Sequence, residues 1–406
     1  MRDFCPEQAM VEVKREFDEY GGVAPAICRS ATFTVMEPGT MPDIFHGKLT
    51  PDVGGCYLYS RHFNPTVKVL DRYLAAMENT QKSISTASGM AAISCSLLQT
   101  CKSGDHIIAS NTVYGGTYAL MAYLFKEIGI EVTFVDPTDI ESFEKAVKSN
   151  TKLIYTETIA NPTLKISDIP KLSEITKRHG LKLIVDNTFT PMIISPAKLG
   201  ADVVVYSMTK FINGASDLLA GSICSSSEFI DKLMDLHTGR VMLYGPTIDA
   251  RVAFDIIQRI PSLALRMREH SRRALAMSEM LENMGVKVSY PGLKNHPQHE
   301  LMDSMINKGY GYGGLLTIDC QTQTKAYDLM RELQNVERFG LLAVSLGYFD
   351  TLISCSSCST SSEIPQDKQD EMGLSDGLLR VSVGITGSLE SRMEQLERAV
   401  RKVLLP

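Results

Sequence analysis

The stretch VVVYSMTKF, residues 203–211, is the part of the sequence that best predicts the fold. It begins with an apolar run of the length of a strand buried in a parallel sheet. Polar residues follow at once, with Ser207, Thr209 and Lys210. In an open α/β sheet, ligands bind outside the carboxyl ends of the strands. The pattern therefore places Lys210 at a candidate ligand site, although a lone loop lysine is more often a solvated surface residue.

A second apolar run, KLIVDN at 182–187, ends in Asp186. An acid at that position, taken alone, is about as often a helix cap or a turn former as a functional residue. Together with the lysine it suggests a cofactor. Pyridoxal phosphate (PLP) needs a lysine for a Schiff base, an acid beside its ring nitrogen and donors for its phosphate. The sequence offers residues of these types. Lys210 is the lysine, Asp186 is the acid, and Ser207 and Thr209 carry hydroxyl donors.

Short apolar runs with helical segments between them recur from residue 83 to 225, namely DHIIAS, EVTFVD, TKLIYTET, KLIVDN and DVVVYS. This alternation predicts a doubly wound, mostly parallel sheet. From about residue 258 a long helix, 265–284, is followed by shorter strands and helices, which is typical of a smaller α+β domain. We expect three parts, which are an N-terminal arm at 1–60, a PLP-binding large domain at 61–257 and a small domain at 258–406.

Length and composition restrict the class of protein. A chain of 406 residues predicts two domains, and a net charge of −6 without basic runs argues against a nucleic-acid partner. The N-terminus carries acids and lacks the apolar core of a signal peptide. No stretch approaches the roughly 18 apolar residues of a membrane span. Nine cysteines, an odd number, predict reduced thiols in the cytoplasm.

Three further motifs are interpreted as structural. Cys355 and Cys358 form a CxxC in a serine-rich loop, but no second pair completes a zinc site. GYGYGG, residues 309–314, spells a dinucleotide fingerprint, but it precedes a strand instead of following one. The histidines of HPQHE, residues 296–300, have metal-like spacing, but the proline between them breaks the helix that would align them.

Motifs along nearly the whole chain resemble, in order and spacing, the γ-family of PLP enzymes of sulfur amino acid metabolism. This family includes methionine γ-lyase, cystathionine γ-lyase and γ-synthase, and the homoserine sulfhydrylases. The chain is most similar to the plant-type methionine γ-lyases. The resemblance implies the fold of aspartate aminotransferase (fold type I) and PLP as cofactor. The matching segments are YSRHFNPT (59–66), SGMAAI (88–93), YGGT (114–117), ETIANPT (157–163), VDNTF (185–189), SMTKF (207–211), SLG (345–347) and LRVSVG (379–384).

The resemblance also implies a role for each site residue. Lys210 and Tyr114 would be catalytic, and Arg380, assisted by Ser345, would bind the substrate α-carboxylate. The implied cofactor-binding set is Tyr59, Arg61, Ser88, Gly89, Met90, Tyr114, Asn161, Asp186, Ser207, Thr209 and Lys210.

Within that set, Tyr59 and Arg61 would serve the neighbouring subunit's site, where they hold the cofactor phosphate. We therefore expect a homotetramer of two dimers with shared sites. From the residues alone, simpler interpretations stay open. Ser88 is also a plain helix cap, and Tyr114 before two glycines is also ordinary turn packing. For Glu157, a role that only orders its loop also stays open.

The implied reaction is γ-elimination from a sulfur amino acid, with L-methionine giving methanethiol, ammonia and 2-oxobutanoate. The alternative is γ-replacement, in which a thiol or a carbon nucleophile adds to the same intermediate. A non-catalytic regulatory relative is a third hypothesis, and the intact set of Asp186, Lys210, Tyr114 and Arg380 argues against it. No metal is expected.

Two departures from the family pattern bear on the substrate. Gly116 stands where microbial methionine γ-lyases usually carry a cysteine. After SLG, residues 348–363 read YFDTLISCSSCSTSSE where the family usually has a glutamate and a histidine-containing loop. Asp350 and this serine-rich loop therefore argue against cystathionine as the substrate.

Overall fold

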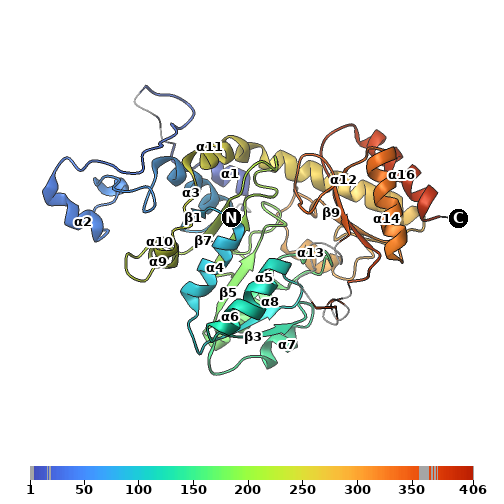
Figure 1. The fold of residues 1–406 in the computed structure, drawn as a ribbon, viewed down its shortest axis with the longest axis horizontal. Coiled ribbons are helices and arrows are strands. Elements are labelled where there is room, and N and C mark those ends of the chain that lie inside the picture. Colours follow the sequence, from blue (N-terminus) through green and yellow to red (C-terminus); the bar gives the residue numbers. More distant parts are fainter. Residues whose placement is uncertain are drawn as a thin grey trace.

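The structure is a computed structural model that describes residues 4–15, 17, 20–355, 365, 366, 369, 372 and 374–405. It contains two β-sheets, each packed against its own helices (Figure 1). The larger sheet is mostly parallel and the smaller one mostly antiparallel. The predicted fold class, a doubly wound α/β domain followed by a smaller α+β domain, is confirmed.

The large sheet has seven strands in the order β1-β7-β6-β5-β4-β2-β3. Strands β2 to β6 run parallel, whereas β7 is antiparallel to both of its neighbours. The five apolar runs of the sequence are all strands of this sheet. The strands are β1 (Lys82–Thr86), β2 (His106–Ser110), β3 (Glu131–Val135), β4 (Thr151–Glu157), β5 (Lys182–Asp186), β6 (Val203–Ser207) and β7 (Gly221–Ser225).

Both faces of the large sheet are covered. On β6, Val204 and Tyr206 enter one hydrophobic cluster, and Val203 and Val205 enter another. Helices that precede, separate and follow the strands complete each cluster. Because both faces of β6 are covered, its sequence shows no alternation of apolar and polar residues. One face carries α3 (Pro65–Glu78), α7 (Ile140–Lys145), α8 (Ile169–His179) and α11 (Ala250–Arg259). The other carries α4 (Gly89–Thr100), α5 (Gly115–Ala119), α6 (Phe125–Glu127), α9 (Ser227–Leu233) and α10 (Arg240–Tyr244).

The second sheet follows helix α12 (Leu263–Asn283), which runs from one sheet to the other (Figure 1). Its strand order is β10-β11-β12-β9-β8. These strands are β8 (Val288–Ser289), β9 (Leu315–Asp319), β10 (Leu341–Leu342), β11 (Leu352–Cys355) and β12 (Leu378–Ser382). The accompanying helices are α13 (His299–Met305), α14 (Gln323–Arg331) and α16 (Leu389–Val403). Short 3₁₀ or π turns are η1 (Pro38–Thr40), η2 (Pro51–Val53), η3 (Leu120–Leu124), η4 (Ile260–Ser262) and η5 (Glu332–Val336).

Helix α12 joins two hydrophobic cores. Met267, in its first half, packs in a core of the large sheet, whereas Ala274, two turns later, packs in the core of the small sheet. The residues at which the domains divide stay a prediction.

We call the described residues among the first 60 the arm. Its helices are α1 (Pro6–Val11), which packs beside α3, and α2 (Met41–Phe45), which lies at the left of Figure 1, away from both sheets. Thr32 of the arm forms an antiparallel bridge with Tyr59. Among the helices of the described residues, none is both long and apolar enough to span a membrane.

Candidate active site

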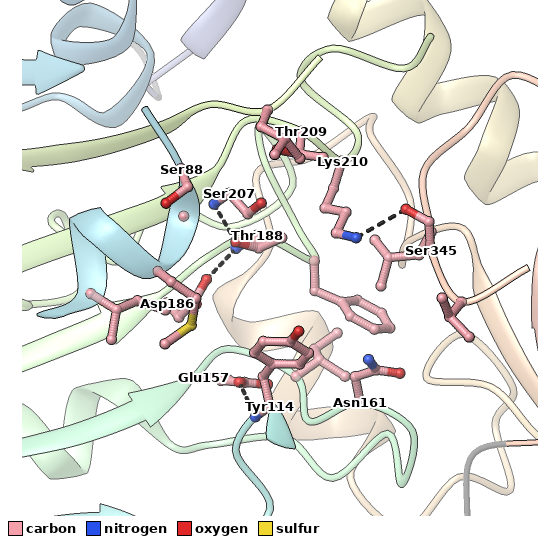
Figure 2. A pocket seen from close by; sticks show the side chains of 18 of the residues that line it. Ser88, Tyr114, Glu157, Asn161, Asp186, Thr188, Ser207, Thr209, Lys210 and Ser345 are labelled. Carbon is pink, nitrogen blue, oxygen red and sulfur yellow. Dashed lines mark hydrogen bonds between the residues drawn. The ribbon is translucent and has the colours of Figure 1, made fainter. Parts of the chain in front are cut away.

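A cavity of about 240 Å³ opens where strands β4, β5 and β6 end. Glu157, Asp186 and Ser207 are the last residues of those strands, so the parallel sheet gathers their side chains at one edge. Figure 2 shows these residues around the hollow, with Lys210 reaching toward Ser345. The described lining residues are Ser88, Gly89, Met90, Ile93, Tyr114, Glu157, Ile159, Asn161, Asp186, Thr188, Phe189, Ser207, Thr209, Lys210, Leu219, Val344, Ser345, Leu346 and Arg380.

Lys210 lies in the turn after β6, and its Nζ donates to the Ser345 hydroxyl at 2.9 Å. Burial, and after it the charge of the nearby Arg380, together lower the pKa of Lys210 to about 8. A lysine with this pKa is available as a neutral amine close to neutral pH. It can therefore act as a nucleophile or as a general base.

Asp186 is a buried carboxylate. It accepts a hydrogen bond from the Thr188 amide at 2.9 Å and one from the Tyr155 hydroxyl at 3.4 Å. Burial raises the pKa of Asp186. Glu157 lies opposite Asp186 on the neighbouring strand, and burial and the charge of Asp186 raise the pKa of Glu157 as well. None of the described ion pairs includes Asp186. A cationic group from outside the chain would restore its ionised form.

Glu157 orients the loop that carries Tyr114. Its carboxylate accepts the Tyr114 amide hydrogen bond at 2.7 Å. The ring of Tyr114 lies over Gly116, where a Cβ would come within 2.7 Å of the ring atom Cε1. Residue 116 therefore limits the positions that this ring can occupy.

The Ser88–Gly89 turn lies against Ser207. The Ser88 hydroxyl accepts from the Ala91 amide at 3.1 Å and so caps α4. A Cβ on Gly89 would lie 2.6 Å from the Ser207 Cβ, so only glycine permits this approach. The first amides of a helix have no carbonyl partner one turn earlier, and they favour an anion. Thr209 accepts from the Ala220 amide at 3.0 Å, which fixes the next hydroxyl of the group.

Arg380 closes the cavity on the side of the small sheet. It is 1% exposed, and it donates to the Ser345 carbonyl at 2.7 Å and to Asn161 Oδ1 at 3.2 Å. Its Nε has no hydrogen-bond partner in the described part of the chain. No described carboxylate pairs with this guanidinium, whose pKa burial lowers to about 10. A buried arginine of this kind fits the carboxylate of a ligand.

The structure thus gathers 11 of the 13 site residues predicted from the sequence around one cavity, leaving out Tyr59 and Arg61. Those two line a second hollow, of about 710 Å³, beside the arm. Arg61 donates to the Met242 carbonyl at 2.9 Å and lies 5.5 Å from the centre of the Tyr59 ring.

Thr188 is a site residue that the sequence analysis missed. Its hydroxyl accepts from the Ser207 amide at 2.7 Å while its own amide donates to Asp186, so it joins two strand ends. Its position inside the VDNTF motif was the available signal. Ile159, Phe189, Val344 and Leu346 were also missed, because apolar lining residues look like core residues in a sequence.

Two of the three motifs interpreted as structural lie wholly among the described residues. His296 lies before α13, whereas His299 begins it, and no cluster of three potential ligands occurs among the described residues. Residues 309–314 lead into β9, as expected. The CxxC includes Cys358, which lies outside the described residues.

Comparisons with known proteins agree with these motifs. Residues 7–400 match the family model described as Cys/Met metabolism PLP-dependent enzyme. The chain is 51% identical over 399 residues to methionine gamma-lyase of Arabidopsis thaliana, covering 98% of this chain and 90% of that protein. It is 37% identical over 355 residues to cystathionine gamma-lyase of Bacillus subtilis, covering 86% of this chain and 89% of that protein. A solved structure of the Campylobacter jejuni metY protein, which contains N'-pyridoxyl-lysine-5'-monophosphate, matches with a TM-score of 0.89 at 27% identity, covering 98% of this chain and 100% of that one.

Proposed function

Because the chain belongs to the Cys/Met metabolism family of PLP-dependent enzymes, we propose that it is a carbon–sulfur lyase that eliminates the γ-substituent of a sulfur amino acid. L-methionine is the proposed substrate. The observation that carries the proposal is the chain of contacts Lys210–Ser345–Arg380, which joins a half-buried base to a buried cation that has no described acidic partner. This pairing suits an amino acid whose Cα proton must be removed while its carboxylate is held.

The residues present fit PLP. Asp186, buried without a described cationic partner, suits a protonated ring nitrogen, and its raised pKa would fall again beside such a charge. The Ser88–Gly89 turn and Ser207 suit the phosphate, because helix-end amides and hydroxyls converge there. Lys210 would hold the cofactor. When bound, PLP supplies an electron sink that makes the substrate's Cα and Cβ protons acidic.

The chain's own residues would then carry out four tasks. Arg380 binds the α-carboxylate, and its unpartnered Nε–H is an available donor. The Lys210 amine accepts the Cα proton from a position fixed by Ser345. Tyr114 gives a proton to the leaving γ-substituent, and Glu157 orients the Tyr114 backbone for this transfer. Proton transfer by a positioned side chain typically contributes about 10²- to 10⁴-fold in rate.

Substrate size is a finer part of the proposal. Asp350, expected from the sequence to help exclude cystathionine, is bound by the Thr386 hydroxyl at 2.7 Å and by Arg392 at 3.3 Å. It is not among the described cavity-lining residues, so this argument against cystathionine loses one of its parts. The rest of it depends on residues 356–363, which lie outside the described residues.

We also propose that active sites are shared between subunits of a tetramer made of two dimers. The support is that Tyr59 and Arg61, both from a motif expected to bind the cofactor phosphate, line a hollow away from the Lys210 cavity. A cytoplasmic location is likewise a proposal, and it depends on the interpretation of the cysteines as reduced thiols.

A substrate panel tests the reaction type. The purified protein is incubated with methionine, with cystathionine, and with O-acetylhomoserine in the presence and absence of sulfide, and the products are identified. A lyase should convert methionine alone to methanethiol, ammonia and 2-oxobutanoate in equal amounts. Inert methionine, with O-acetylhomoserine consumed only when sulfide is present, would make the protein a γ-replacement enzyme.

A further inference from the structure

Two buried basic side chains on α12 have no part in the proposed reaction. Arg266 and His270 are one turn apart, so both project from the same face of the helix. Both are buried, with exposed fractions of 6% and 0%. Both contact Phe211, the residue after Lys210, and α12 itself runs between the two sheets (Figure 1).

Arg266 holds the carbonyl groups that directly follow Lys210. Its guanidinium donates to the Phe211 carbonyl at 2.5 Å and to the Ile212 carbonyl at 2.9 Å. Its charge lies 5.7 Å from the centre of the Phe349 ring. No described carboxylate pairs with it, and burial lowers its pKa to about 10. A buried cation is costly, and here its donors bind two consecutive carbonyls of one turn.

His270 contacts the same turn and the strand of Arg380. Its ring meets the ring of Phe211 edge-on, with 5.2 Å between the centres. Its Nδ1 lies 2.6 Å from the Val383 carbonyl, which can only accept, so Nδ1 carries the proton and donates. Val383 directly follows β12, the strand that holds Arg380. Burial lowers the pKa of His270 to about 4, so the ring is neutral at pH 7.

The loop that carries Ser345 packs against Phe211 as well. A Cβ on Gly347 would lie 2.5 Å from the Phe211 amide nitrogen, and the Gly347 amide donates to the Ser382 hydroxyl at 2.9 Å. Phe211 is therefore the point where the Lys210 turn, the Ser345 loop and α12 meet.

We infer that Arg266 and His270 are positioning residues that fix the Lys210 turn relative to Arg380. They set the distance between the base and the carboxylate-binding cation without touching the substrate. This inference rests on the proposed function, because it assigns those two roles to Lys210 and Arg380. A displacement of about 1 Å between reacting groups can lower a rate by about 10²-fold.

Helix α12 itself offers a matched control. Arg273 is 6% exposed, and it donates to two consecutive carbonyls, Thr386 at 3.0 Å and Gly387 at 2.7 Å. Those carbonyls belong to neither the Lys210 turn nor β12. Arg266→Met and Arg273→Met therefore each remove a buried arginine that binds two consecutive carbonyls. Arg273 also pairs with Glu269 at 2.6 Å, so its replacement removes an ion pair as well, and only Arg266→Met releases the Lys210 turn.

The test compares kcat, KM and thermal unfolding of the holoenzyme variants, using whichever reaction the wild type catalyses in the substrate panel. Arg266→Met should lower kcat by about tenfold or more, while KM stays within about threefold because Arg380 is intact. Arg273→Met should keep kcat within about twofold at a similar loss of Tm. Borohydride reduction should leave the pyridoxyl group covalently attached to Lys210. The yield of this labelling gives a readout that is independent of turnover.

Two further variants cover the case in which Arg266→Met does not fold. Arg266→Lys keeps the charge but offers a single donor group, and His270→Phe keeps the ring but loses the bond to Val383. Both should lower kcat with only a small loss of Tm relative to the wild type. Equal kcat losses in the Arg266 and Arg273 variants, or unchanged kcat in Arg266→Lys and His270→Phe, would overturn the inference. A wild type that cleaves no methionine but performs γ-replacement overturns only the proposed lyase reaction.

Discussion

Replacing Gly116 by alanine is expected to lower the turnover number without lowering the stability of the fold. In the structure, a Cβ at this position would lie 2.7 Å from Cε1 of Tyr114, about 0.7 Å closer than the 3.4 Å at which ordinary contact begins. Tyr114 is 43% exposed, so solvent leaves room for its ring to be displaced by the new methyl group. The displaced hydroxyl would then miss the γ-substituent that it is proposed to protonate.

The size of the two effects follows from their separate causes. A displacement approaching 1 Å can lower a rate by up to about 10²-fold, so we expect kcat to fall between about 10- and 100-fold. Gly116 lies in helix α5 and is not among the glycines with a positive φ. Alanine is favoured over glycine in helices by up to about 1 kcal/mol. The free energy of unfolding should therefore stay the same or rise slightly.

The assay measures steady-state kinetics with the best substrate of the panel, together with thermal unfolding. The double variant that combines Gly116→Ala with Tyr114→Phe provides the control, because the phenol is already absent in it. Tyr114→Phe alone should slow elimination by about 10²-fold or more. Adding Gly116→Ala to it should then change kcat by less than about threefold. An unchanged kcat in the single Gly116 variant, or a full further loss in the double variant, would refute the reasoning.

Three other outcomes are expected. Borohydride reduction followed by peptide mapping should find the pyridoxyl group on the peptide that spans residues 207–211, and a label on another lysine contradicts the assignment of Lys210. Mixing inactive Arg61→Ala and Lys210→Ala chains under exchange conditions should restore part of the activity, since a mixed dimer can assemble one intact shared site; mixtures no more active than their parents argue against sharing. In the cofactor-free protein, the pKa of Lys210 is lowered from 10.5 to about 8, so the folded state binds fewer protons than the unfolded state between these pH values and its stability rises with pH there. Lys210→Met should therefore be more stable than the wild type at pH 7, by about 3 kcal/mol, and denaturant unfolding should show this advantage vanishing as the pH rises from 8 to 10.5.

The parallel strands could be predicted because both of their faces are buried. Such strands read as uninterrupted apolar runs, as in residues 203–206, and this is a local property of the chain. Strands β1 and β7, with sequences KSIST and GSICS, escaped prediction. On β1, the hydroxyl of Ser83 donates to the Asp71 carbonyl and that of Ser85 to the Asp71 carboxylate, both at 2.6 Å. Their burial depends on a helix that precedes them in the chain, so no local pattern indicates it.

The sequence by itself determined the fold class, the family and the chemical types of the site, because motifs such as SMTKF and VDNTF carry these in order along the chain. Only the tertiary structure decided how those groups meet. Ser345 contacts Lys210 through its hydroxyl and Arg380 through its carbonyl, although the three residues are far apart in the chain. The same is true of Arg266, which looks like a surface arginine of a long helix in the sequence and yet lies buried against the Lys210 turn. The physical reason is that burial, hydrogen-bond partners and pKa depend on which distant segments pack together, whereas residue type and periodicity do not.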